Sequence, residues 1–222
     1  MLVDDAYDKV FELLDKDCLD VSMVSLYKQQ APVNPLALPN VNMKHAICLS
    51  EKIIEDLYNI QLYTRQTNYE VPFFLFGEER NDGSVYFDRI IYYKNQQRSN
   101  ANFLPLRAHL LSFIDEVQKN KLTRRVVCHG HTHGMGVYAD NFSLDDMVAY
   151  VIMSESHNLM KKGIIQTIGC VFNSSGDFNF VLYDKHNNGF YKFPNVFIEY
   201  DNGEKDYLPA YIKGVYNGTK YR

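Results

Sequence analysis

Apolar residues recur at two different periods along the chain, and the change of period predicts alternating helices and strands. Helical spacing over residues 3–14 predicts a short amphipathic helix. The three prolines of residues 20–42 disfavour a long helix or a central strand, so this segment is expected to be an extended connector. Residues 1–42 are therefore expected to form an N-terminal appendage, and residues 43–222 the main domain.

The main domain is expected to open with a strand over 44–49 and a helix capped by Ser50. Apolar and β-branched runs over 71–76 and 84–93 flank the turn sequence Asn81-Asp82-Gly83 and predict two paired strands. The same criteria predict a helix over 105–117, a strand over 126–128, a helix over 144–153 and strands over 164–172, 178–183 and 190–200. The predicted fold class is α/β in the α+β sense, with a mixed sheet flanked by helices.

Composition narrows the possible partners. Of the 222 residues, 46% are hydrophobic and 23% charged, as in an ordinary globular chain. The net charge of −4 leaves no excess of cations to neutralise phosphates, so nucleic acid is not expected as a partner. No run approaches the roughly 20 apolar residues of a membrane span, and the acidic start does not resemble a secretory signal. A cytoplasmic location is expected.

The cysteines point to no disulfide framework. Cys18, Cys48, Cys128 and Cys170 lie far apart and form no CxxC pair. They are expected to be reduced thiols in or near the core.

The residues that indicate chemistry lie between Val126 and Met147. His131 and His133 are expected just after a strand, where alternate side chains point the same way and two imidazoles can reach one metal ion. Asp146, in the first turn of the next predicted helix, can supply a third ligand. Three protein ligands and a water describe a catalytic zinc site.

Three families with an HxH pair lack their other required residues here. Metallo-β-lactamases need Asp and His soon after the pair, where this chain has Gly134-Met135-Gly136, and cupins need a nearby Glu. Amidohydrolase barrels carry the pair near the start of a much longer chain.

The segment instead resembles the JAMM motif of MPN-domain zinc metalloproteases, in prokaryotic or phage-type members. That motif is an upstream Glu, then HxH, then SxxD, and the chain has Glu70 before an apolar run ending at Gly77, then His131-Thr132-His133, then Ser143 to Asp146. The order of predicted elements from about residue 43 to about residue 200 also resembles the MPN layout. The chain departs from the family pattern in three places. Gly134 stands where Pro is usual, and residues 128–130 lack the usual aromatic residue. The segment 134–142 is two residues longer than the common spacing.

The resemblance implies a peptidase or isopeptidase. His131, His133 and Asp146 would bind Zn²⁺, Glu70 would carry a proton, and Ser143 would stabilise the oxyanion. The implied partner is a protein or peptide substrate, such as the C-terminal tail of a ubiquitin-like or sulfur-carrier protein, or a phage or mobile-element protein.

Each of these assignments has an alternative. Ser143 and Asp146 form a possible capping box, Glu70 is a possible solvated residue at a strand start, and Asp145 is an alternative ligand to Asp146. His129 is expected to pack or hydrogen-bond nearby and not to bind metal. At the level of function, the alternatives are a noncatalytic MPN scaffold that binds a protein partner and a metal-dependent hydrolase of a small molecule.

Overall fold

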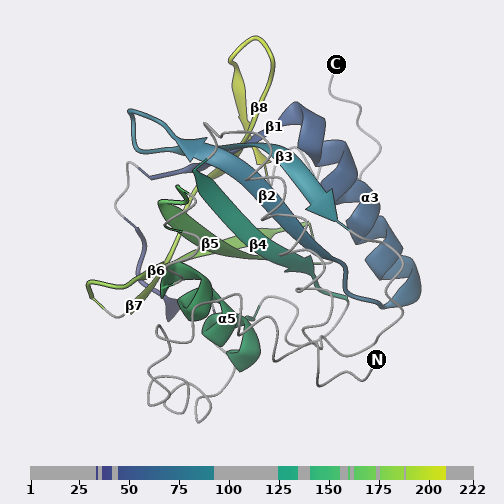
Figure 1. The fold of residues 1–222 in the computed structure, drawn as a ribbon. Coiled ribbons are helices and arrows are strands. Elements are labelled where there is room, and N and C mark those ends of the chain that lie inside the picture. The colour runs from purple at the N-terminus through teal and green to yellow at the C-terminus, as the bar shows by residue number, and fades with distance from the viewer. Residues whose placement is uncertain are drawn as a thin grey trace.

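The computed structural model describes residues 34, 37–41, 45–92, 125–134, 141–155, 160, 163–173, 176–187 and 189–208. The helices predicted over 3–14 and 105–117 lie outside the described residues. The described chain has a mixed α+β fold, which confirms the predicted class at that level. Helices α3 and α5 flank a strand-rich sheet (Figure 1).

A sheet of nine strands forms the centre of the described fold, in the order β7-β6-β5-β4-β2-β3-β1-β8-β9. The strands are β1 (Ile47–Ser50), β2 (Pro72–Glu79), β3 (Val85–Tyr92), β4 (Val126–Thr132), β5 (Gln166–Phe172), β6 (Phe178–Asp184), β7 (Gly189–Lys192), β8 (Val196–Glu199) and β9 (Lys205–Tyr207). Three neighbouring pairs are parallel, namely β1 with β3, β1 with β8, and β4 with β5. The other pairs are antiparallel. β4 is therefore an interior strand between β2 and β5 (Figure 1).

The predicted hairpin around residues 81–83 is confirmed. β2 and β3 are antiparallel neighbours, and Gly83 between them has a φ of 81°, a conformation that glycine adopts without strain. The Asp82 carboxylate accepts hydrogen bonds from the backbone N–H and the hydroxyl of Ser84, at 2.9 and 2.6 Å. The side chain of Asp82 thus closes the turn that its sequence position predicted.

The single strand predicted over 190–200 is wrong, because this run divides into β7 and β8. The two strands lie toward opposite ends of the strand order, because β7 pairs with β6 and β8 pairs with β1. The break falls at Pro194, which has no backbone N–H to donate to a neighbouring strand. β9, which the sequence did not predict, follows and pairs with β8.

Helix α3 (Glu51–Thr67) begins where expected, directly after Ser50. Ser50 occupies the N-cap position but makes no capping hydrogen bond through its side chain, so the predicted capping contact is absent. Ser50 is also the last residue of β1 and is only 3% exposed. The helix ends at Asn68, which has a left-handed φ of 58° and donates its N–H to the carbonyl of Thr64.

The two helices pack against opposite faces of the sheet. Apolar residues of α3, such as Leu57, share one buried cluster with Cys170 and Phe172 of β5. Helix α5 (Leu144–Glu155) contributes Tyr150 to a second cluster that contains Val171. Successive residues of a strand point to opposite faces of the sheet. Val171 therefore faces α5, whereas its neighbours Cys170 and Phe172 face α3.

Part of the predicted N-terminal connector lies against the sheet. Val41 donates its N–H to the carbonyl of Lys192, and Lys192 donates to the carbonyl of Pro39, both at 2.9 Å. Residues 39–41 therefore line the free edge of β7. Among the described residues, no helix has the length and apolar composition needed to cross a bilayer.

The prediction of reduced thiols is confirmed for three cysteines. Cys48, Cys128 and Cys170 are buried and free. Cys18 lies outside the described residues.

Candidate metal centre

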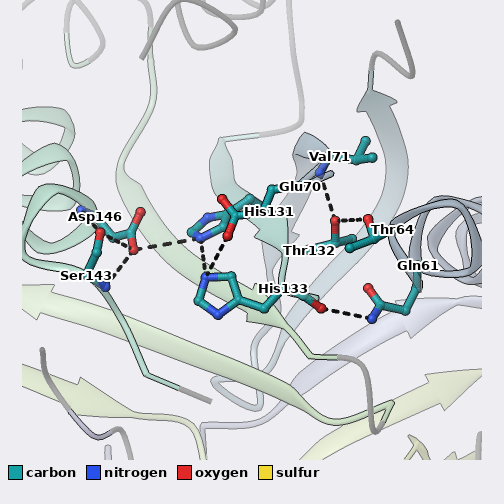
Figure 2. Close-up of polar contacts among 9 residues, drawn as sticks. All are labelled: Gln61, Thr64, Glu70, Val71, His131, Thr132, His133, Ser143 and Asp146. Carbon is teal, nitrogen blue, oxygen red and sulfur yellow. Dashed lines mark hydrogen bonds and ion pairs between the residues drawn. The ribbon is translucent and has the colours of Figure 1, made fainter. Parts of the chain in front are cut away.

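His131 and His133 project from the end of β4 toward each other. Their Nε2 atoms are 2.8 Å apart, and their ring centroids are 4.7 Å apart (Figure 2). The expectation that residues two apart in an extended segment share a face is therefore confirmed. The predicted strand boundary is wrong, because β4 continues from residue 128 to Thr132. β4 is longer than predicted because it pairs with β2 on one side and with β5 on the other. Beyond its last residue, the N–H of His133 also donates to the carbonyl of Phe172.

Two facing imidazole nitrogens fit a metal ion. Without one, a single proton between Nε2 of His131 and Nε2 of His133 makes them donor and acceptor. Tetrahedral zinc with bonds of about 2.0–2.1 Å sets two ligand nitrogens roughly 3.3 Å apart. The observed 2.8 Å is about half an ångström shorter, which small side-chain rotations make up.

Two carboxylates stand on either side of this imidazole pair (Figure 2). Oε1 of Glu70, just before β2, lies 3.8 Å from Nε2 of His133. Oδ2 of Asp146, in the first turn of α5, lies 3.7 Å from Nε2 of His131. The ligand atoms of Glu70, His131 and His133 all lie within 4.8 Å of one another. The donor set of two imidazoles and a carboxylate is one that zinc accepts.

Ser143 and Asp146 form a reciprocal cap at the start of α5. The backbone N–H and the hydroxyl of Ser143 both donate to Oδ2 of Asp146, at 2.8 and 2.7 Å. The N–H of Asp146 donates to the Ser143 hydroxyl oxygen at 3.2 Å. The capping interpretation of these two residues is thus confirmed, and it also holds the Asp146 carboxylate beside His131. The side chain of Asp145, the alternative ligand, lies outside what the structure describes.

Burial and charge act together on Glu70. Burial raises the pKa of the Glu70 carboxyl, His133 opposes the rise, and the negative charge of Asp146 adds to it. The side chain is nevertheless 34% exposed, against 12% for Asp146. Of the two carboxyls, Glu70 is therefore the more accessible to water and the better suited to exchange protons.

Tyr150 fixes the position of α5 on the sheet, and so the position of Asp146 one turn earlier. Its buried ring lies against Gly169 of β5, where a Cβ atom would be only 2.2 Å from the ring. The ring also contacts Phe142 and His129, with centroids 5.8 and 6.1 Å away. A glycine in β5 thus lets the helix approach closely enough for its first turn to reach β4.

His129 packs as expected. It is 6% exposed, and its ring lies 4.9 Å from Phe74 and 6.1 Å from Tyr150, measured between centroids. It belongs to the packing under α5 and is not part of the group that Glu70, His131 and His133 form.

The unusual Gly134 has a structural reason. A Cβ atom at this position would lie 2.2 Å from Oδ1 of Asn68, the residue that ends α3. The end of α3 therefore crowds the residue after His133, and a proline there would meet the same atom. The packing of Asn68 against the end of β4 therefore leaves little room for a side chain at position 134.

Thr132, Thr64 and Gln61 had no role in the sequence-based prediction, yet Thr132 and Gln61 contact the backbone around the site and Thr64 contacts Thr132. Thr132 lies between the histidines and is fully buried, and its hydroxyl hydrogen-bonds to Thr64 and Val71 (Figure 2). The side-chain amide of Gln61 donates to the carbonyl of His133 at 3.2 Å. Thr132 could have been noticed in the sequence as a polar residue within a buried strand, because a buried polar side chain requires a hydrogen-bonding partner.

Comparisons with known proteins identify no family. No protein-family model matches the chain, and no curated protein matches it. Solved structures that resemble it include the solution structure of protein DSY2949 from Desulfitobacterium hafniense, with 14% identity and a TM-score of 0.42 over 70% of this chain and 94% of that one.

Proposed function

We propose that the protein is a zinc-dependent peptidase or isopeptidase of the JAMM type, built on an MPN-like α+β domain. The observation that carries the proposal is the meeting of five residues from three separated segments, namely Glu70, His131, His133, Ser143 and Asp146. The same five residues are those that the resemblance to the JAMM motif implied from the sequence. Agreement between spacing and three-dimensional proximity supports a common chemical role.

In this proposal His131, His133 and Asp146 hold Zn²⁺. The two imidazoles are preorganised by β4, and the Asp146 carboxylate is fixed by its hydrogen bonds from Ser143. When bound, the ion supplies Lewis-acid chemistry, which polarises the scissile carbonyl and makes water more acidic. Glu70 remains outside this set because a fourth protein ligand would close the position that hydrolysis needs.

Glu70 acts as the proton carrier. Its raised pKa and partial exposure suit a carboxylate that takes a proton from the attacking water and later releases it. The hydroxyl from water adds to the carbonyl carbon, the C–N bond breaks, and Glu70 returns the proton to the leaving amine. The products are a carboxylic acid and an amine, and Glu70 is regenerated as a carboxylate.

Ser143 stabilises the oxyanion. Its side chain is exposed at the start of α5, and its hydroxyl donates to Asp146 before substrate binds. Rotation about the side chain redirects this donor toward the developing negative charge. The backbone N–H of Ser143 continues to hold the Asp146 carboxylate during that rotation.

The proposed substrate is an extended protein tail, such as the C-terminus of a ubiquitin-like or sulfur-carrier protein, or a site in a phage or mobile-element protein, encountered in the cytoplasm. The test is cleavage of a panel of ubiquitin-like fusions by the wild type and by His131→Ala/His133→Ala. His186→Ala is the matched control, since His186 is exposed in the turn after β6. Cleavage by the wild type and the control, abolished in the double variant, supports the proposal. Equal cleavage by all three proteins contradicts it.

A further inference from the structure

Thr132 faces away from the imidazoles between which it lies in the sequence. It is fully buried, as is Thr64 of α3, and the two hydroxyls are hydrogen-bonded (Figure 2). The N–H of Val71, the residue after Glu70, donates to Oγ1 of Thr132 at 2.8 Å. A single hydroxyl therefore contacts both the helix and the segment that carries Glu70.

The direction of each hydrogen bond in this group follows from its chemistry. Val71 N–H can only donate, and the carbonyl of Ile60, 3.1 Å from Oγ1 of Thr64, can only accept. The Thr64 proton therefore points to Ile60, and the proton between the two hydroxyls belongs to Thr132. The chain of donors runs from Val71 through Thr132 and Thr64 to Ile60, and every proton in it has an acceptor.

This chain connects the backbones that carry the candidate catalytic groups. Thr132 N–H also donates to the carbonyl of Val71 at 3.1 Å, so Thr132 and Val71 are joined twice. Gln61 of α3 holds the carbonyl of His133 from the same helix. The distance between Glu70 and His133 is thus set from the face of β4 opposite the imidazoles.

We propose that Thr132 and Thr64 are positioning residues, which hold the end of β4, and with it the imidazoles of His131 and His133 that bind the metal, in place against the segment that carries Glu70. This inference rests on the proposed function and adds residues that the sequence motif did not include. Outer residues that orient metal ligands commonly change metal affinity by 10- to 100-fold when they are altered. Neither threonine would hold the ion itself, so their effect would be exerted through the backbone of β4.

The test compares zinc affinity, measured by competition with a chromophoric chelator, in wild type, Thr132→Val and Thr132→Ser. Valine keeps the shape but removes both hydrogen-bonding functions, whereas serine keeps the hydroxyl. The matched control is Thr167→Val, which breaks a similar hydroxyl pair between Thr167 and Ser154 of 2.6 Å, on the far side of the sheet. Thr64→Val is a second variant at the other end of the proposed pair, in case Thr132→Val does not fold.

We expect Thr132→Val and Thr64→Val to weaken zinc binding by about 10- to 100-fold, and Thr132→Ser and Thr167→Val to bind as the wild type does. Wild-type zinc affinity in Thr132→Val or Thr64→Val overturns this inference and leaves the proposed function standing. Equal weakening in Thr167→Val has the same consequence, because it would indicate a general loss of stability. A wild-type protein that binds no zinc overturns the proposed function and this inference with it.

Discussion

Oδ2 of Asp146 accepts two hydrogen bonds from Ser143 while it lies 3.7 Å from Nε2 of His131. One oxygen atom thus takes part in the N-terminal cap of α5 and also faces a candidate metal ligand. Capping and metal binding are compatible at this position, because the cap fixes the carboxylate where the imidazole can share an ion with it.

The two roles of this contact can be separated by mutation. Asp146→Asn keeps an oxygen that accepts from Ser143, so we expect little change in melting temperature but a loss of zinc affinity of at least 10-fold. Ser143→Ala removes the cap, and we expect the free energy of unfolding to fall by about 0.5–2 kcal/mol with zinc retained. Zinc titration and thermal denaturation of both variants provide the measurement. Unchanged zinc affinity in Asp146→Asn would remove Asp146 from the ligand set.

Glu70→Gln tests the proton carrier. Glutamine has nearly the same size but cannot accept the proton of water, so turnover should fall by roughly 10²- to 10⁴-fold. Zinc content should remain that of the wild type, because Glu70 is not a ligand in this account. Both quantities are measured on one preparation: loss of zinc would show that Glu70 is a ligand, and full turnover would show that the proton carrier is another residue.

Gly134 and Asn68 should be energetically coupled. Gly134→Ala directs a methyl group at Oδ1 of Asn68, and we expect it to cost about 1 kcal/mol of unfolding free energy, at the low end for added volume because the Asn68 side chain can rotate. Asn68→Gly removes that oxygen and suits the left-handed backbone at this position. In a double-mutant cycle measured by chemical denaturation, the alanine should cost less in the Asn68→Gly background. Strict additivity would mean that the crowding does not explain the glycine.

Local patterns in the sequence were sufficient for α3, for the hairpin at residues 81–83 and for the shared face of His131 and His133. Each depends on residues close in the chain, where a period or a turn residue determines the geometry. The parallel pairing of β8 with β1 and the addition of β9 depend on contacts between distant segments. The same holds for the contact of Thr132 with Thr64 of α3 and for that of Gly134 with Asn68, the C-terminal cap of α3. Local sequence patterns do not predict which helix packs against a given strand.

The ion pair between Arg80 and Glu199 should make stability depend on pH. Two hydrogen bonds of 2.6 and 2.8 Å join the guanidinium to the carboxylate, and Arg80 holds the pKa of Glu199 below its ordinary value. A lowered pKa in the folded state stabilises the fold above the unfolded-state pKa, and this contribution is lost as the pH falls through the folded-state value. Glu199→Gln should therefore lose about 1–2 kcal/mol at pH 7, and its deficit should shrink on acidification below about pH 4.

Chemical denaturation of wild type and Glu199→Gln across this pH range provides the measurement. Glu204→Gln, an exposed neighbour bonded to Asn202, is the control and should show no such dependence. A deficit that stays constant down to the lowest pH at which the protein folds would contradict the assignment.

Elemental analysis of the purified protein shows whether the facing imidazoles of His131 and His133 bind zinc. The wild type and the exposed-histidine control His186→Ala should each carry about one zinc per chain, and His131→Ala/His133→Ala should carry none while keeping its secondary structure. Added zinc at 100 times its dissociation constant should stabilise the metal-free wild type by about 2.7 kcal/mol, and the double variant not at all. Equal zinc content in the wild type and the folded double variant would show that these two imidazoles do not hold the metal.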